Sequence, residues 1–228
     1  DRLDYAFRTG AGPRAGCGNQ SELNCGGVTH MIRRLIPSMA RKNKIFFLGF
    51  SKCGTTALHH LLKKNGIRSL HYHDKGLYAA TIIEQNVVRQ RDPLRYLSKF
   101  EAFLDIVIAS DTCYTEANKY YREFYEFYPD SYYVYNDRPV DDWINSRFNH
   151  TDFADRQALY FKVNKSELAD LWRQIYETHK RETMAFFRDK PRFIHFDIVT
   201  DDIRKLTTFL KPDYHFRNFD FKKVNVTK

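Results

Sequence analysis

The 228-residue sequence lacks the features on which several classes of protein depend. No stretch reaches the roughly 18 consecutive apolar residues of a membrane-spanning helix. The 4 cysteines stand at irregular spacing, which does not fit a zinc site built from close cysteine pairs. No basic run is long enough for a nucleic-acid-binding arm, and no recognition-helix or RNA-platform motif occurs. The sequence therefore gives no support to a membrane-spanning helix, a cysteine-rich zinc site or a nucleic-acid-binding arm.

Basic and aromatic residues, in contrast, are plentiful. The chain has 37 Lys and Arg residues against 28 Asp and Glu residues, a formal net charge of +9. Such an excess favours an anionic partner, for example a nucleotide, an acidic glycan or a membrane surface. With 43% hydrophobic residues, including 19 Phe and 15 Tyr, the chain can bury one sizeable core, so we expect a single domain.

The pattern of apolar residues changes near residue 44, where we expect the domain to begin. Residues 1–43 show little periodicity and are interpreted as an N-terminal arm or stem, and residues 44–228 as the domain. The domain alternates β-type apolar runs with helical segments, which is typical of an α/β fold whose central parallel sheet is flanked by helices. The expected strands are 44–50, 67–73, 105–110, 131–137 and 192–197, and the clearest expected helices are 55–65 and 166–188.

The most specific motif joins the first expected strand to the first helix in a P-loop-type strand–loop–helix. It reads GFSKCGTT over residues 49–56. A helix N-terminus behind such a loop offers backbone N–H groups and a positive dipole end to an anion. Loops that bind nucleoside triphosphates place a lysine after the second glycine, where this chain has Thr55. Its lysine, Lys52, lies inside the loop, which suits one 5′-phosphate with a sulfuryl group attached.

With this loop the sequence resembles the sulfotransferases that use 3′-phosphoadenosine-5′-phosphosulfate (PAPS), whose loop reads PKSGTT or PKTGTT. Here the loop reads SKCGTT and differs at the first and third positions. The resemblance implies that the loop binds the 5′-phosphosulfate and that Lys52 neutralises charge on the bridging oxygen as the S–O bond breaks, without a metal ion. The implied donor-binding residues are Ser51, Lys52, Cys53, Gly54, Thr55 and Thr56.

The same family has an arginine at the end of a later strand and a serine eight residues on, both in contact with the 3′-phosphate. This chain has Arg138 directly after the fourth expected strand and Ser146 eight residues later. A guanidinium can bind a 3′-phosphate, the group that distinguishes PAPS from ATP, through paired charge-assisted hydrogen bonds. The resemblance continues to the end of the chain, where Lys222, Lys223 and Asn225 are lesser candidates for donor contacts.

Transfer to a hydroxyl needs a base, and histidine, with an ordinary pKa of about 6.5, suits that role. His71 and His73 lie two residues apart in the expected second strand, so we expect their side chains on one face. We assign the base first to His73, because it lies closer to the strand's carboxyl end, and second to His71. Asp74 and Glu84 are alternatives, and Asp111, after the third expected strand, is a candidate to orient the acceptor or the base.

These motifs predict a sulfotransferase that moves a sulfuryl group from PAPS to a hydroxyl or amine acceptor. A glycan, a small alcohol or phenol, or a peptide would each supply such a group. Two alternatives stay open. One is a P-loop nucleotide kinase or NTPase, and the other is a non-catalytic nucleotide- or glycan-binding protein on the same fold.

Features outside the motifs bear on the cellular location. Four N-glycosylation sequons favour the Golgi lumen or the wider secretory pathway over the cytoplasm. They are Asn19, Asn149, Asn164 and Asn225. The chain begins with Asp1, so we expect a shortened or processed form whose native membrane anchor, where one exists, lies outside it. Cys17 and Cys25 could close a small disulfide loop or remain free thiols.

Overall fold

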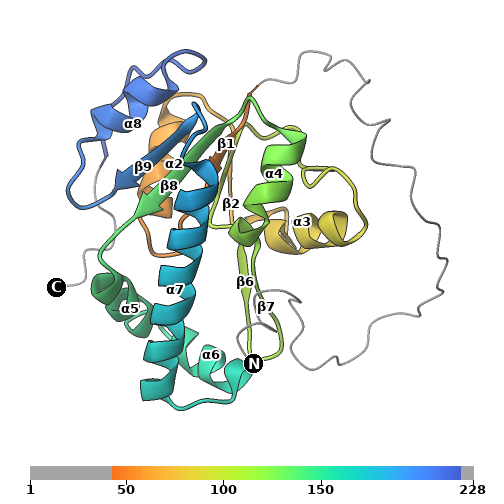
Figure 1. Cartoon of the computed structure of the whole chain (residues 1–228), viewed down its shortest axis with the longest axis vertical. Helices are drawn as coiled ribbons and strands as arrows, with labels where there is room; N and C mark the ends of the chain where they lie inside the picture. Colours follow the sequence, from red (N-terminus) through yellow and green to blue (C-terminus); the bar gives the residue numbers. More distant parts are fainter. Residues whose placement is uncertain (1–42, 222–228) are drawn as a thin grey trace. The chain divides into compact units, whose positions relative to one another are not determined.

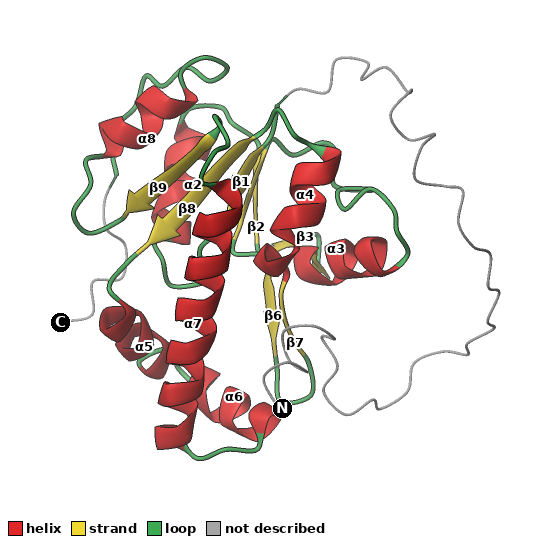
Figure 2. Cartoon of the chain, in the orientation of Figure 1, coloured by secondary structure: helices red, strands yellow, loops and turns green. Residues whose placement is uncertain are grey.

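A computed structural model of the chain describes residues 43–221. At its centre lies a five-stranded sheet, in which every pairing is parallel and the strand order is β2-β5-β1-β8-β9 (Figures 1 and 2). The strands are β1 (Ile45–Phe47), β2 (Ser69–His71), β5 (Ala102–Leu104), β8 (Tyr132–Asp137) and β9 (Phe193–Asp197). The prediction of a single-domain α/β fold with a central parallel sheet is confirmed.

Helices cover both faces of this sheet, because successive strand residues point to opposite sides. Ile45 and Phe47 of β1 pack into one apolar layer, together with α2 (Thr55–Lys64) and α8 (Ile203–Leu210). Phe46, between them, packs into the layer on the other face. All three side chains are buried, as expected for a central parallel strand.

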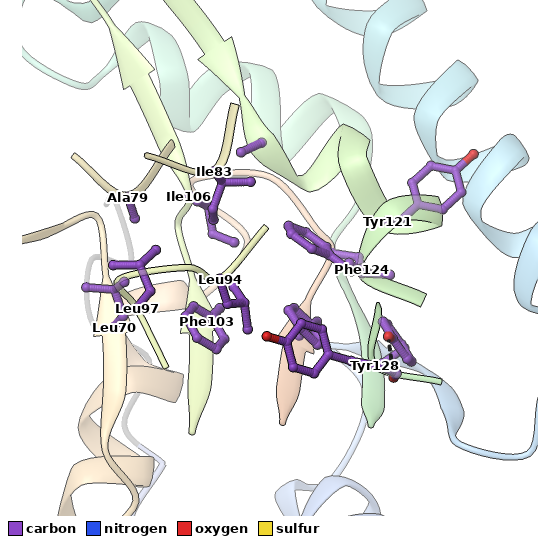
Figure 3. Packing of buried hydrophobic residues seen from close by; sticks show 14 of the residues in the cluster. Leu70, Ala79, Ile83, Leu94, Leu97, Phe103, Ile106, Tyr121, Phe124 and Tyr128 are labelled. Carbon is purple, nitrogen blue, oxygen red and sulfur yellow. Dashed lines mark hydrogen bonds between the residues drawn. The ribbon is translucent and has the colours of Figure 1, made fainter. Parts of the chain in front are cut away.

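The second layer is largely aromatic. The ring of Phe46 stacks on those of Phe103, Phe124 and Tyr133, with centroid separations of 5.5, 4.7 and 5.3 Å. Figure 3 shows Phe103 and Phe124 among the buried residues of this layer. Aromatic pairs of this kind contribute about 0.5–1.5 kcal/mol each beyond the burial of their area. The helices on this face are α3 (Ala79–Val88), α4 (Tyr121–Phe127) and the end of α7 (Lys165–Phe187).

The remaining elements gather beyond the carboxyl ends of the strands. In Figure 1, α5, α6 and the β6–β7 pair lie below the arrowheads of β8 and β9. These elements and the short ones beside them are β3 (His73–Asp74), β4 (Leu77–Tyr78), β6 (Val107–Ala109), β7 (Tyr114–Glu116), the 3-10 turn η2 (Ala117–Tyr120), α5 (Val140–Phe148) and α6 (Phe153–Phe161). They form two-stranded hairpins and helices that build walls around the sheet's carboxyl edge.

The prediction of the third strand, at residues 105–110, is wrong. Its place in the sheet belongs to β5, three residues earlier, while Val107–Ala109 pairs antiparallel with Tyr114–Glu116 in a separate hairpin. The chain turns between these strands at Asp105, whose φ is 52°. Residues 102–109 are one nearly continuous apolar run, and hydrophobic periodicity alone cannot place a break within such a run.

The second predicted strand is too long at its carboxyl end. β2 stops at His71, because Tyr72 adopts a left-handed φ of 69°, and His73 begins the β3–β4 hairpin. His71 and His73 therefore do not share the face of one strand, contrary to the prediction. The other predicted strands and both predicted helices are found, with ends that differ by at most three residues.

Several expectations lie outside the described residues. They concern the N-terminal arm up to residue 42, Cys17, Cys25, Asn19, Lys222, Lys223 and Asn225. Asn149 and Asn164 occupy exposed positions, and the side chain of Asn164 also caps α7 by accepting hydrogen bonds from the N–H groups of Ser166 and Glu167. The cellular location stays a prediction. No helix between residues 43 and 221 has both the length and the hydrophobicity to cross a bilayer.

A buried ion pair joins α5 to the β6–β7 hairpin. Arg147 Nη2 donates to Glu116 Oε1 at 2.5 Å, and the Tyr114 hydroxyl donates to the same oxygen at 2.9 Å. The arginine is fully buried, and its guanidinium lies 4.2 Å from the ring centroid of Trp143 and 5.1 Å from that of Phe153. The pair therefore holds two walls of the carboxyl edge together.

Replacing Arg147 by Leu should destabilise the fold strongly, because it leaves the Glu116 carboxylate buried without its counter-ion. We expect the free energy of unfolding, measured by urea denaturation, to fall by about 3–5 kcal/mol. The double variant with Glu116→Gln should recover part of that loss. Arg173→Leu, which removes the exposed partner of Asp141, is the control and should change stability much less. Equal losses in the two single variants would contradict this role.

Candidate active site

The strands β1 and β8 are neighbours whose following connections run to opposite faces of the sheet. The chain leaves β1 through α2, which packs on one face, and leaves β8 through α5, α6 and then α7, which packs on the other. Connections that diverge in this way leave room for a ligand beyond the strand ends. The 49–56 loop follows β1 and Arg138 follows β8, so both features predicted from the sequence lie at the carboxyl ends of these two strands.

The 49–56 loop begins two residues after β1, in close contact with Asn136 of β8. A Cβ atom on Gly49 would lie 1.9 Å from the backbone oxygen of Asn136, so no side chain fits there. The Gly49 N–H donates to Asn136 Oδ1, and Asn136 Nδ2 donates to the Cys53 carbonyl, each at 2.9 Å. One buried asparagine of β8 thus binds both arms of the loop, a role that the sequence motif did not indicate.

The carbonyl groups of the loop are turned toward β8 and α5. Those of residues 51–53 each accept a side-chain hydrogen bond of 2.9 Å. The donors, in order along the loop, are Trp143 Nε1, Arg138 Nη1 and Asn136 Nδ2. Lys52 and Gly54 have left-handed φ values of 74° and 73°, and no side chain caps α2. The first N–H groups of α2 have no acceptor within the helix, so this end of the helix can bind an anion.

The Lys52 side chain is half-buried beside this helix end. Burial lowers the pKa of Lys52, Asp105 raises it in part, and the nearby cations Arg138 and Arg147 lower it further. Because Lys52 lies close to two arginines and one carboxylate, a bound anion would stabilise its charged form.

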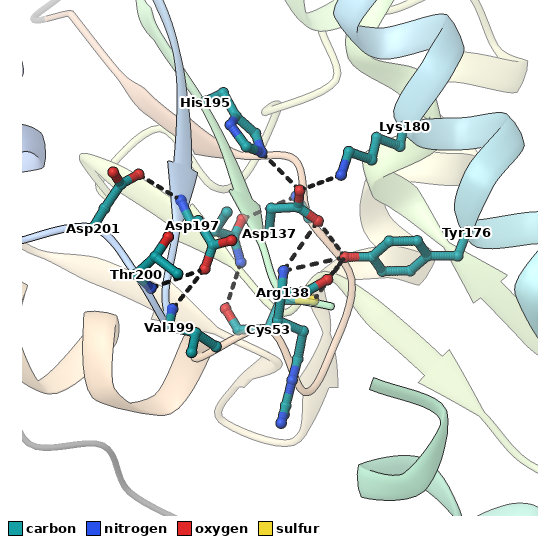
Figure 4. A network of polar contacts seen from close by, with 12 residues as sticks. Cys53, Asp137, Arg138, Tyr176, Lys180, His195, Asp197, Val199, Thr200 and Asp201 are labelled. Atoms are coloured by element: carbon teal, nitrogen blue, oxygen red, sulfur yellow. Dashed lines mark hydrogen bonds and ion pairs between the residues drawn. The ribbon is translucent and has the colours of Figure 1, made fainter. Parts of the chain in front are cut away.

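Arg138 is held by a network centred on Asp137 (Figure 4). The Tyr176 hydroxyl, from α7, contacts Asp137 Oδ1 and the Arg138 carbonyl, the latter at 2.9 Å. Lys180 Nζ and His195 Nε2 contact the other carboxylate oxygen at 2.5 and 2.7 Å. Because Asp137 Oδ1 also accepts the Arg138 N–H at 3.0 Å, the network fixes the backbone from which the arginine side chain extends.

The charge of Asp137 is maintained by these partners. Burial by itself would raise the pKa of Asp137, but hydrogen bonds from His195, Lys180 and Tyr176 lower it to about 2. The carboxylate is therefore ionised throughout the neutral range.

Other residues of the two motifs lie at the same edge in different surroundings. Cys53 is fully buried with its sulfur 3.9 Å from the Tyr176 hydroxyl, and burial raises the pKa of its thiol to about 12. It therefore contributes its backbone to the loop. Ser146 is buried on α5, and no hydrogen bond within residues 43–221 joins it to Arg138. Thr55 is buried and Thr56 half-buried at the start of α2.

A pocket of about 290 Å³ opens beside Lys52. Its walls come from four segments: the loop, the end of β2 with the start of β3, the β5–β6 segment, and the α5–α6 segment. The titratable side chains that line it are Lys52, His71, Tyr72, His73, Asp105, His150 and Arg156. Of these, Lys52, His71 and His73 were predicted from the sequence, and the others were not.

The two candidate histidines differ in their surroundings. His71 Nε2 lies 3.4 Å from both Asp105 Oδ2 and Thr55 Oγ1, whereas His73 is exposed on the β3–β4 hairpin. Burial lowers the pKa of His71, Asp105 raises it in part, and His60 and His73 lower it further. A neutral imidazole beside a carboxylate is the arrangement that general-base catalysis requires, so the geometry favours His71.

The other predicted acids have structural partners or lie elsewhere. Asp74 forms an ion pair of 2.5 Å with Lys99, and Glu84 accepts hydrogen bonds from the Thr115 and Tyr120 hydroxyls. Asp111 lies in the exposed β6–β7 turn rather than at the sheet edge, because the strand before it is not part of the sheet.

Asp105 takes the place that the sequence analysis gave to Asp111. It directly follows β5, and a carboxylate after an apolar run was the available signal. Among residues 43–221, no group of three or more His, Cys, Asp or Glu side chains is placed to hold a metal ion.

Comparison with known families bears on the chemistry of this site. A family model described as a sulfotransferase domain matches residues 44–205, from the start of the sheet to the first turn of α8. The chain belongs to this sulfotransferase family. The match includes Lys52, His71, Asp105 and Arg138 within its bounds. No curated protein matches the chain. Membership in the family supports sulfotransfer in general and weighs against the kinase alternative.

Asp137→Asn in this sulfotransferase should reduce stability in a pH-dependent manner. Since the folded pKa is about 2 and the ordinary value is 3.8, the carboxylate stabilises the fold by about 2 kcal/mol above pH 4. This contribution is lost as the pH falls toward 2. Urea denaturation at pH 7 and at pH 3 should therefore show a smaller difference between variant and parent at pH 3. A difference independent of pH would mean that Asp137 acts through its shape alone. Asp141→Asn, in an exposed ion pair, is the control.

Proposed function

We propose that this sulfotransferase moves a sulfuryl group from PAPS to a hydroxyl group of its acceptor. The observation that carries the proposal is the meeting of Lys52 with the His71–Asp105 pair in one pocket at the carboxyl edge. The loop that contributes Lys52 leads directly into the uncapped N-terminus of α2. Family membership supplies the reaction class, and the residues beside the pocket supply reasons to choose this donor.

The residues at the loop and at Arg138 suit the two phosphate groups of PAPS. The first turn of α2, with Thr56 and Lys52, would hold the 5′-phosphosulfate. Arg138 would hold the 3′-phosphate, because its Nε is buried without a hydrogen-bond partner among residues 43–221 and a buried guanidinium N–H needs an acceptor. PAPS supplies a sulfuryl group joined to a phosphate leaving group.

The side chains of the pocket then account for the transfer. His71 accepts the proton of the acceptor hydroxyl as the acceptor oxygen bonds to sulfur and the bond from sulfur to the bridging oxygen breaks. Lys52 stabilises the negative charge that passes to the bridging oxygen. Asp105, at 3.4 Å, orients the imidazole and stabilises its protonated form. An amine acceptor would use the same groups.

Adenosine 3′,5′-bisphosphate, the expected product, should raise the melting temperature of the protein, whereas ATP with Mg²⁺ should not. Arg138→Ala should remove this shift. Lys52→Ala should keep the fold but lower kcat by about 10²–10³-fold or more, the usual cost of losing one group that stabilises transition-state charge. Arg173→Ala, on the exposed side of α7, is the matched control for charge. A shift with ATP and Mg²⁺ alone would contradict the choice of donor.

The pH dependence of kcat/KM should identify the base. Because burial lowers the pKa of His71, the acid limb should lie below pH 6.5, and activity should be lost as the pH falls through it. Asp105→Asn removes an interaction that raises this pKa, so the limb should move to lower pH while the rate falls. The basic limb should lie below 10.5, the ordinary pKa of lysine, because burial lowers that of Lys52.

Histidine variants complete this test. His71→Ala should lose activity and the acid limb, while His73→Ala should keep both. The opposite result would assign the base to His73, the residue preferred on sequence grounds.

A further inference from the structure

The pocket beside Lys52 contains basic side chains that the transfer of the sulfuryl group leaves unused. Lys52, His71 and Asp105 have roles in that step. His150 follows α5 and Arg156 lies on α6, so both belong to a different wall from the loop and β2. Neither contacts the loop through any hydrogen bond of the described residues.

Arg156 has unused hydrogen-bonding capacity at this wall. Its Nη2 lies 3.2 Å from Asp152 Oδ1, one helical turn earlier, in a pair whose side chains are 39% and 63% exposed. Its Nε, in contrast, is buried and has no hydrogen-bond partner among residues 43–221. A buried N–H without an acceptor is costly. Because Arg156 also lines the pocket, an oxygen of a ligand bound there could satisfy this N–H.

The charges around the pocket also favour a ligand with an anionic group. Apart from Lys52, which the proposed donor occupies, its lining holds the permanent cation Arg156 and three histidines, against the single carboxylate of Asp105. That carboxylate already faces His71. Asp152, outside the lining, offsets part of the charge of Arg156 from the solvent side. A cleft lined mainly by one sign of charge favours a ligand of the opposite sign.

The size and the aromatic walls of the pocket restrict the ligand further. A volume of about 290 Å³ is at the lower end of the roughly 300–1,000 Å³ typical of ligand pockets, so about one ring of the acceptor can enter. Phe153 and Tyr72 present aromatic surface to that ring. His150 packs edge-on against Phe153 and contacts its neighbour Thr151 through Nδ1, which leaves the other ring nitrogen for a ligand.

We infer that the acceptor is a ring-bearing hydroxyl compound with an anionic group, a carboxylate or a sulfate, which Arg156 binds with His150 while the hydroxyl faces His71. The inference rests on the proposed function and adds the class of substrate. Arg156 is a binding residue for the acceptor, and Asp152 competes with the acceptor for its guanidinium.

Pairs of acceptors that differ only in charge test the inference. One pair is methyl β-glucuronide with methyl β-glucoside, and the other is 4-hydroxybenzoate with 4-methylphenol, so that sugar and aryl sources are distinguished. Each is titrated by calorimetry into the protein saturated with adenosine 3′,5′-bisphosphate, and each is assayed with PAPS. In at least one pair, the anionic member should bind about 10- to 100-fold more tightly, the range of one charge-assisted contact.

Variants at the α6 wall make the test specific. Arg156→Gln should remove the preference by raising KM for the anionic member with little change in kcat, and should leave the neutral member unaffected. Arg156→Lys should restore part of it. Asp152→Asn should strengthen the preference, because it frees the guanidinium, whereas Arg173→Gln, on α7, should change nothing.

Three outcomes would overturn the inference. They are equal binding of the members in both pairs, binding of no anionic member, and a preference that survives Arg156→Gln. Failure of the proposed function would be seen separately, as the absence of any stabilisation by the bisphosphate before an acceptor is added.

Discussion

The close approach of β1 and β8 is the constraint on which the rest of the site depends. At Gly49 the two strands leave no room for a Cβ atom, and Asn136 uses this proximity to bond the loop at Gly49 and again at Cys53. Once both arms of the loop are tied to β8, its carbonyl groups have partners on that side. The N–H groups at the start of α2 then remain for a ligand. The steric contact at Gly49 thus helps to determine that N–H groups, and not carbonyl groups, remain for an anion at this end of α2.

Helix α7 supports this constraint from behind. Tyr176 binds the Arg138 peptide and Asp137, and His179, one turn later, contacts the Leu48 carbonyl at 2.8 Å, just before Gly49. Burial lowers the pKa of His179 to about 4, so the ring is neutral and donates to that carbonyl. Two side chains of one helix thereby hold the carboxyl ends of both strands that flank the crevice. An ordinary amphipathic pattern in α7 therefore includes residues that shape the site.

The strand–loop–helix around residues 49–56 was predictable from the sequence, whereas most of the pocket beside it was not, for a physical reason. Binding of phosphate by a loop and a helix end depends on backbone geometry, which a short motif such as residues 49–56 specifies locally. The pocket beside Lys52 depends on breaks at Tyr72 and Asp105, non-glycine residues with positive φ whose position an apolar pattern does not specify. It also depends on Arg156, about 100 residues beyond the loop, which only tertiary packing brings there.

The balance of charge in the pocket links the roles proposed for Lys52 and His71. Burial lowers the pKa of both Lys52 and His71, and the single carboxylate of Asp105 raises both. The carboxylate of Asp105 therefore offsets only part of the effect that burial has on the two pKa values. A bound anion near Lys52 adds the missing negative charge. In the proposed reaction it would thereby increase the affinity of His71 for a proton at the stage when the acceptor hydroxyl loses one. The electrostatics that attract the proposed donor would then also prepare the proposed base.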